Sequence, residues 1–291
     1  MSAVPTLKRL TATGAAAVAL AAALTACGGG VSKPSFVAKA DGACAAGNGA
    51  LAGVTKPTNQ PELATAAGTI ASTVDAQAAA LGAIKAPKAD KALVAGVVAA
   101  LAAVPGPARA LQEAAGKTDD AATGQAASDL RGKVDAAAVQ AKAYGLNGCG
   151  AGLQAPIGTI LDGGRTVLKA AFVAKAESLC TTANRKADAL ASPTSLATEA
   201  KYMAAYVPIE EKLFNDIKAL PKPPGDESPV SDMLAAQDQV IAKDKEILAA
   251  AQKGNNSLFG RLNDEEAPLI TAANSKFDAY GLRACGTLSD F

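Results

Sequence analysis

The sequence reads FVAKADGAC at residues 36–44 and FVAKAESLC at residues 172–180. A second matching pair, YGLNGCG at residues 144–150 and YGLRACG at residues 280–286, has the same separation of 136 residues. Because both pairs share one offset, the chain contains two copies of one unit that is bracketed by cysteines. The sequence therefore predicts two tandem domains of the same architecture.

The composition of the repeated unit favours helices. Alanine dominates the 49% of hydrophobic residues, aromatic residues make up 3%, and there is no tryptophan. Alanine is the strongest helix former, and the residue types that favour strands never cluster in alternation. Apolar residues in 172–190 recur at steps of three and four, as on one face of a helix. We expect an all-α protein with two tandem antiparallel four-helix bundles.

Prolines and glycines mark where the helices end. The sequence PGP at residues 105–107 is expected to break or bend the third helix of the first copy. Pro208 is expected to kink the second helix of the second copy. Gly145 and Gly281 are expected to end the fourth helices in the left-handed conformation.

The four repeat cysteines are expected to form two disulfides. In an up-down-up-down bundle the end of the fourth helix lies beside the start of the first. Cys44 lies about 12 Å along the first helix from Phe36, and the tail after Gly145 has a reach of about 13 Å. Of the three possible pairings, this geometry favours Cys44–Cys149 and Cys180–Cys285, so that each bundle is closed by one disulfide.

The N-terminus is typical of an export signal. Lys8 and Arg9 precede an apolar run at residues 10–24, which is too short to span a bilayer. The run ends in LTAC at residues 24–27, which resembles the bacterial lipobox and implies a lipid on Cys27. Of the five cysteines, four belong to the repeats, and Cys27 is the fifth.

These features divide the chain as follows. We expect a signal peptide at residues 1–26, a lipidated tether at 27–34, a first helical bundle at 35–150, a linker at 151–167 and a second helical bundle at 168–291. The linker contains Pro156 and two adjacent glycines, but its apolar residues leave open that it lies against one bundle.

The chain resembles a set of actinobacterial lipoproteins of unknown function. These show a lipobox, an Ala-Asp/Glu-x-x-Cys motif on the first helix and a terminal Tyr-Gly-Leu-x-x-Cys motif. The two inner motifs occur here at residues 40–44 and 144–149, and again at 176–180 and 280–285. The resemblance implies anchoring at the outer face of the cell membrane and no known activity.

The composition also excludes several kinds of site. The chain has no histidine, which removes the usual general base at neutral pH and imidazole as a metal ligand. With the repeat cysteines in disulfides, we expect no catalytic, metal or cofactor-binding residues, hence no enzyme. The charge is balanced, with 28 basic and 27 acidic residues, so nucleic acid is not an expected partner.

The remaining candidate residues have simple structural interpretations. Tyr144 and Tyr280 are expected to pack at the bundle ends with their hydroxyls in water. The acidic run at residues 264–266 is expected to lie at a helix start, where negative charge is favourable. Asp129 and Glu265 are equivalent positions in different domains and therefore not a catalytic pair.

The first helix of each copy also carries two charged residues near its start, which are expected to be solvated. These are Lys39 and Asp41 in the first copy and Lys175 and Glu177 in the second. The prolines at 105–107 and at 208 mark where a bundle could open a groove.

The sequence thus favours a lipid-anchored extracytoplasmic module without enzymatic activity, which binds an envelope protein or other envelope component. The alternative is a carrier or sensor of a small apolar ligand within a bundle, which requires an apolar cavity of several hundred cubic ångströms. An interaction module instead requires an exposed apolar patch.

Overall fold

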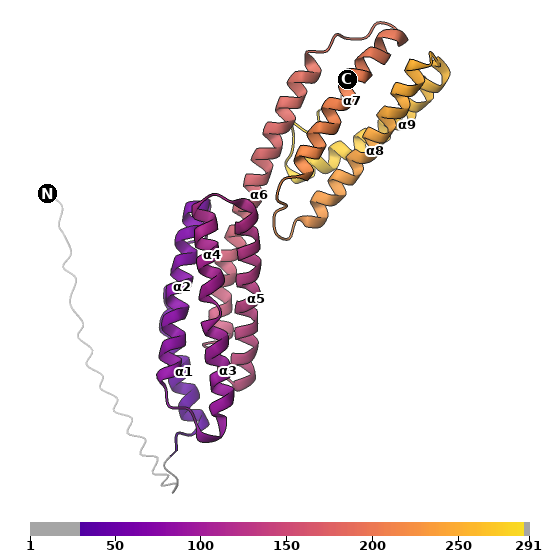
Figure 1. Cartoon of the computed structure of the whole chain (residues 1–291). Coiled ribbons are helices and arrows are strands. Elements are labelled where there is room, and N and C mark those ends of the chain that lie inside the picture. The colour runs from indigo at the N-terminus through magenta and orange to yellow at the C-terminus, as the bar shows by residue number, and fades with distance from the viewer. Residues whose placement is uncertain (1–29, 288–291) are drawn as a thin grey trace, which may run out of the picture.

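The computed structural model describes residues 30–287, and every element in that range is a helix (Figure 1). In chain order the helices are α1 (Lys33–Ala52), α2 (Gln60–Ala83), the short 3₁₀ helix η1 (Lys88–Asp90), α3 (Lys91–Ala102), α4 (Pro105–Gly116), α5 (Asp120–Tyr144), α6 (Ala151–Asp188), α7 (Leu196–Lys218), α8 (Glu227–Gln252) and α9 (Asn256–Tyr280). They form two bundles joined end to end, which confirms the predicted all-α fold.

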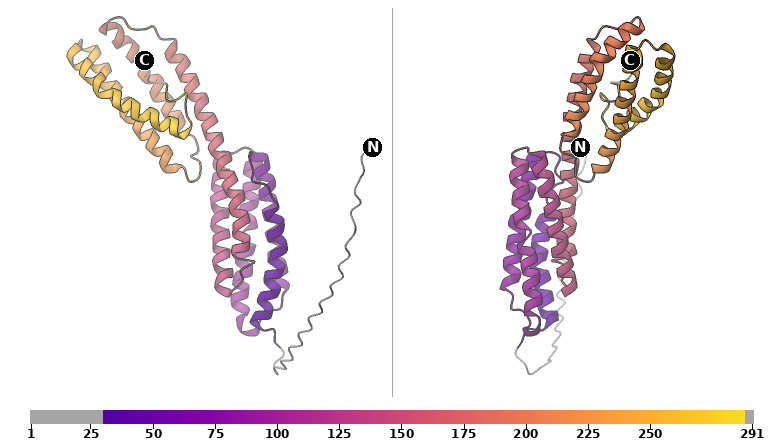
Figure 2. Two further views of the ribbon diagram at one scale, coloured as in Figure 1. Left: turned by 180° about the vertical axis from the view of Figure 1, so that it is seen from behind. Right: turned by 45° about the vertical axis from the view of Figure 1, so that its right-hand side comes forward.

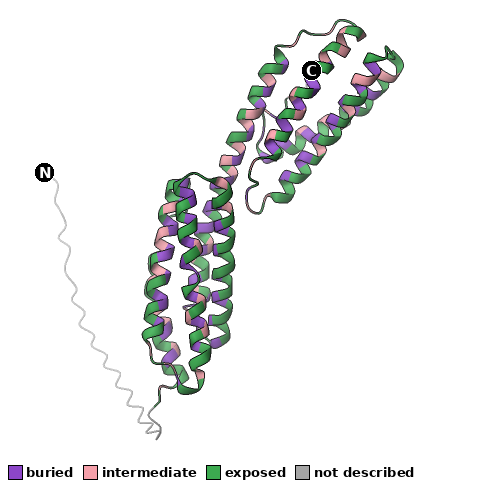
Figure 3. Ribbon diagram, viewed as in Figure 1, coloured by how far each residue is buried: buried purple, intermediate pink, exposed green. Residues whose placement is uncertain are grey.

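The first bundle contains α1, α2, α5 and the pair α3–α4. The third helix is broken as predicted: α3 ends at Ala102 and α4 begins at Pro105, because proline cannot continue the hydrogen bonds of the preceding turn. Figure 3 shows the buried residues on the sides of these helices that face one another and the exposed residues on their outer sides. Leu63, Leu101 and Leu130 are among the fully buried residues of this core.

Helix α6 belongs to both bundles. It is continuous over 38 residues, and the segment 151–167 that was expected to be a linker forms its first half. Leu153, Ile157 and Ile160 are fully buried in the core of the first bundle, so burial of this apolar face explains the helix. The second half, from Phe172, is the first helix of the second bundle, which α7, α8 and α9 complete (Figure 2).

The two copies correspond residue by residue. Helices α5 and α9 begin and end 136 residues apart, and the last residues of α1 and α6, Ala52 and Asp188, have the same separation. The N-cap residues of α2 and α7, Asn59 and Ser195, have the same separation, as do the C-cap glycines Gly145 and Gly281. Each residue of the second bundle therefore has a counterpart 136 positions earlier.

The glycine caps have the predicted geometry. Gly145 and Gly281 have φ angles of 99° and 101°, and the next residue, Leu146 or Leu282, donates its amide back to the last turn of the helix. This is the Schellman arrangement. It turns the chain back toward the start of the first helix.

Both predicted disulfides are present. Cys44–Cys149 and Cys180–Cys285 join Cα atoms 5.2 and 5.0 Å apart. The acidic residue three positions before each first cysteine supports the returning tail. Asp41 Oδ1 accepts from the amide of Gly148 at 2.8 Å, and Glu177 Oε1 accepts from the amide of Ala284 at 2.9 Å.

The prediction that Asp41 and Glu177 are merely solvated was therefore wrong, because the tail amides need acceptors at this turn. The lysines of the same group behave differently from each other. Lys39 is exposed as expected, whereas Lys175 pairs with Asp120 at the start of α5 at 2.5 Å.

The tyrosines before the caps also differ from expectation. The hydroxyl of Tyr144 donates to Asp90 at 2.8 Å, and that of Tyr280 donates to Asp226 at 3.0 Å. Burial and the neighbouring aspartate raise the pKa of Tyr144 to about 12. The expectation of hydroxyls in water was wrong because an aspartate at the start of the third helix lies within reach in each copy.

Part of the first bundle also has the length and composition of a membrane-spanning helix, namely residues 88–116. Core helices satisfy the same criteria. Val97, Leu101 and Leu111 of this segment are buried in the first core, in line with the expected core helix.

The tether predicted at 27–34 ends earlier than expected, because α1 begins at Lys33 with Ser32 as its N-cap.

Candidate functional site: an acidic cavity in the second bundle

The second bundle contains a cavity of about 450 Å³. Residues from the end of α6 and from α7, α8 and α9 line it. Met203, Val240 and Ile270 give it an apolar wall, while Asp244 and Glu266 give it an acidic one. Asp188 and Glu199 lie toward the solvent side of the same cavity.

Three acidic side chains are buried beside this cavity, each on a different helix. Glu210 of α7 is fully buried, Asp244 of α8 is 5% exposed and Glu266 of α9 is 7% exposed. Gln237 donates from Nε2 to Glu210 Oε1 at 2.6 Å. No donor within residues 30–287 reaches Glu210 Oε2 or Glu266 Oε1.

The acidic cluster of Glu210, Asp244 and Glu266 shares protons. Burial, a hydrogen bond to Asp244 and the negative charge of Asp244 together raise the pKa of Glu210 to about 10. Burial and the charge of Asp244 raise the pKa of Glu266 to about 8. Both glutamates therefore hold a proton at neutral pH, and Asp244 is the acceptor that both approach.

The first bundle shows what these positions hold in an ordinary core. The counterparts of Glu210, Asp244 and Glu266 are Val74, Ala108 and Leu130, all buried in the first core. The counterpart of Gln237 is Leu101, which is also fully buried. The second copy thus has a polar network where the first has only apolar side chains.

This replacement is costly for folding. A carboxyl group that is removed from water without a compensating cation loses solvation, and it keeps its proton rather than its charge. No lysine or arginine is among the residues that line the cavity. Since the fold is formed without such residues in the first bundle, the acidic cluster is not required for the architecture.

The first bundle also explains why the cavity is open in the second. There, Gly163 and Gly164 of α6 lie directly against Pro57 and Leu63. The counterparts of Pro57 and Leu63 are Pro193 and Glu199, both of which line the cavity. No helix within residues 30–287 covers these positions in the second bundle as α6 covers them in the first.

Two aromatic rings form a further part of the wall. Tyr202 and Tyr206 stack with ring centroids 5.8 Å apart and an angle of 11° between the planes. Tyr206 is buried, and burial together with Glu210 and Asp244 raises its pKa. Tyr202 is half-buried and lines the cavity. The counterpart of Tyr202 in the first bundle is Ala66, and that of Tyr206 is Ile70.

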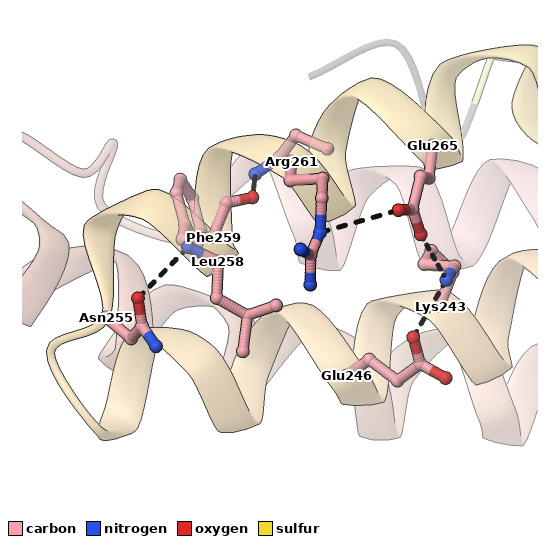
Figure 4. Close-up of polar contacts among 8 residues, drawn as sticks. Lys243, Glu246, Asn255, Leu258, Phe259, Arg261 and Glu265 are labelled. Carbon is pink, nitrogen blue, oxygen red and sulfur yellow. Dashed lines mark hydrogen bonds and ion pairs between the residues drawn. The ribbon is translucent and has the colours of Figure 1, made fainter.

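The acidic run at residues 264–266 is not at a helix start. Asn255 caps α9, accepting from the amide of Leu258 at 3.0 Å, so the helix begins two turns before the run (Figure 4). The prediction was wrong because the Gly254–Asn255 turn already provides the helix start. Glu266 points into the core, whereas Glu265 pairs with Lys243 at the surface.

Other sequence-predicted residues take no part in the cavity. Asp129 is exposed in the first bundle and accepts from Gln125 at 2.9 Å. Its counterpart Glu265 lies in the second bundle, as expected. Pro208 lies inside α7 and borders a smaller cavity of about 190 Å³. Cys27 and the signal peptide lie outside the described residues.

The comparisons with known proteins give no relative. No family model matches the chain, and neither a curated protein nor a solved structure matches it. None of the acidic groups within residues 30–287, the buried cluster included, has the arrangement of metal ligands. The functional argument therefore rests on the cavity and on the difference between the two copies.

Proposed function

We propose that the protein is a lipid-anchored extracytoplasmic binding protein whose second bundle holds a small molecule in the 450 Å³ cavity. The single observation that carries this proposal is the replacement of Val74, Ala108 and Leu130 of the first core by three acidic residues around a cavity in the second. The size lies within the range of about 300–1,000 Å³ that is typical of small-molecule sites.

The first bundle acts in this proposal as a spacer. Residue 30, where the described chain begins, lies at the end of the first bundle that faces away from the second (Figure 1). The cavity lies beside Ala187 and Asp188, at the end of α6. A helix of 38 residues extends about 57 Å at 1.5 Å per residue, so the cavity is held away from the membrane.

A small ligand accounts for the surface better than an envelope protein does. Within residues 30–287 the exposed large apolar side chains are Leu93 and Val139, both in the first bundle. A protein-docking face usually presents a larger continuous apolar patch. The lack of such a patch on the described residues favours the cavity as the place where binding occurs.

The test uses full-length protein extracted in detergent from its own membrane. Native mass spectrometry is expected to show an acylated chain carrying a bound mass. The variant Glu210→Val/Asp244→Ala/Glu266→Leu, which restores the residues of the first core, is expected to lose that mass. A matched control, Glu211→Gln/Asp238→Asn/Asp264→Asn, changes one surface acid on each of the same helices and is expected to keep it.

A chain without bound mass, or a mass that the triple core variant retains, would reject the proposal. A protonated carboxyl group with a pKa of about 8, such as Glu266, would also suit a general acid. Binding without catalysis predicts that the molecule released from the cavity is chemically unchanged after prolonged incubation.

A further inference from the structure

We infer that the molecule held in the second bundle carries a positively charged nitrogen, seated between the acidic wall of the cavity and the ring of Tyr202. This inference rests on the proposed function and names the ligand class of the same cavity. It follows from the charges that face the cavity, from an unused acceptor, from the aromatic pair and from the apolar wall.

All of the charged side chains that line the cavity are acidic. Asp188 comes from α6, Glu199 from α7, Asp244 from α8 and Glu266 from α9. Acidic groups on four separate helices converge on one space, and their fields add in a region of low dielectric constant. An anion would be repelled there, whereas a cation would be attracted from every side.

The lysine that acts on Glu266 does not neutralise the cavity. Lys243 of α8 acts on Glu266 and lowers its pKa to a small extent. However, its Nζ is 2.8 Å from Glu246 Oε2 and 3.1 Å from Glu265 Oε2 at the surface (Figure 4). Arg261 also faces Glu265, at 3.6 Å. These cations are already paired outside the cavity.

The buried glutamates are protonated in place of being balanced by a cation. The acidic cluster keeps protons on Glu210 and Glu266 because it is buried and because Lys243, the neighbouring cation, is paired with Glu246 and Glu265. Glu266 is more than nine-tenths buried, lines the cavity, and has no hydrogen-bond donor at Oε1. A ligand ammonium group would supply the charge and allow Glu266 to release its proton.

The remaining walls fit an organic cation better than a bare ion. The face of an aromatic ring attracts a cation within about 6 Å of its centre, and Tyr202, which stacks on Tyr206, lines the cavity together with the acids. Met203, Val240 and Ile270 provide an apolar surface for the body of the ligand. The cavity therefore suits a molecule with a cationic head and an apolar part.

The test compares cations with neutral molecules of the same shape. The pairs are choline with 3,3-dimethylbutan-1-ol and phenyltrimethylammonium with tert-butylbenzene, and benzenesulfonate serves as the anion. Binding to the full-length protein is measured by ligand-observed NMR and by calorimetry at pH 6 and pH 9. We expect at least one cation to bind tenfold or more tightly than its neutral partner, with no binding of benzenesulfonate.

Proton release provides a second readout. Quaternary ammonium ions cannot titrate, so any proton released on binding comes from the protein. At pH 7, calorimetry in buffers of different ionisation enthalpy is expected to show release of up to about one proton per cation. The cation is expected to bind more tightly at pH 9 than at pH 6. Glu266→Gln should abolish the release and weaken binding, while Asp264→Asn, on the same helix but exposed, should change neither.

The outcomes separate this inference from the proposed function. If the neutral partners bind as tightly as the cations, or if binding releases no proton, the charge inference fails while the cavity remains a binding site. If none of the five probes binds at either pH while native mass spectrometry still shows a bound mass that the triple core variant loses, the inference is rejected and the proposed function stands; if that mass is also absent, both are rejected. Binding that survives in Glu266→Gln with its proton release intact would also overturn the inference.

Discussion

At the residue scale, the raised pKa values of Glu210 and Glu266 couple the stability of the second bundle to pH. A group whose pKa is raised on folding stabilises the fold fully below its unfolded value and loses that contribution as the pH rises to its folded value. Here the window runs from about 4.5 to about 10 for Glu210 and from about 4.5 to about 8 for Glu266.

We therefore expect the free energy of unfolding of the second bundle to fall between pH 5 and pH 9, by at most about 1.4 kcal/mol per pH unit for each group. Thermal unfolding followed by circular dichroism measures this dependence. Glu266→Gln should flatten the part of the curve below pH 8, and Asp264→Asn should leave it unchanged. A melting temperature of the second bundle that rises with pH in this window would contradict the pKa directions.

The acidic cluster is also expected to cost stability at a fixed pH. The variant Glu210→Val/Gln237→Leu/Asp244→Ala/Glu266→Leu carries the residues of the first core and needs no buried proton. Replacement of buried charged groups by packed apolar residues is often stabilising by about 1–4 kcal/mol. Chemical denaturation at pH 8 should show such an increase for the second bundle, and a decrease would show that the network stabilises the fold.

At the element scale, α6 is the helix that joins the two bundles. It contributes Leu153 to the first core and Phe172 to the second without an interruption between them. Contacts at the joint support it: Lys169 lies 3.3 Å from Asp226, and Arg165 Nε donates to the carbonyl of Pro224 at 3.0 Å. A rigid helix at this point keeps the cavity at a fixed distance from the first bundle.

Breaking α6 at the joint should release the two bundles from each other. Ala170 is exposed between the two cores, so Ala170→Pro removes a helical hydrogen bond without changing either core, at a cost of about 3 kcal/mol. Small-angle scattering should then show a wider distribution of dimensions, and both bundles should remain helical. Ala170→Ser serves as the control, and unchanged scattering in Ala170→Pro would mean that the side-chain contacts alone hold the joint.

The elements show which parts of the structure are readable from sequence. The disulfides and the Gly145 and Gly281 caps depend on local signals that repeat at one offset, and the break at Pro105 depends on a local proline signal in the first copy alone. The helicity of residues 151–167 was missed because Pro156 and Gly163–Gly164 are also typical of linkers. Only the three-dimensional packing shows that these glycines allow α6 to approach Pro57 and Leu63.

The candidate site was missed for a different reason. Glu210, Asp244 and Glu266 lie on three helices, far apart in sequence, and no local motif connects them. A signal was nevertheless available, because comparison of the two copies at the offset of 136 places acids opposite Val74, Ala108 and Leu130. An acid opposite an apolar core residue in a duplicated fold indicates that the two copies have diverged.

At the scale of the whole molecule, the two bundles have separate cores and separate disulfides, each closing a loop with a sequence separation of 105. A loop of this length contributes about 4–5 kcal/mol in the chain-entropy model. Each disulfide should therefore stabilise mainly its own bundle. The first bundle has the additional cover of α6, and the second carries the buried acids, so the second is expected to unfold first at pH 8.

Differential scanning calorimetry should accordingly resolve two transitions. Cys180→Ala/Cys285→Ala should lower the transition of the second bundle and leave that of the first nearly unchanged, while Cys44→Ala/Cys149→Ala should do the reverse. The pH dependence should follow the lower transition, because Glu210 and Glu266 belong to the second core. A single transition that both cysteine pairs shift equally would show that α6 couples the bundles into one cooperative unit, so that ligand binding in the cavity would stabilise the whole rod.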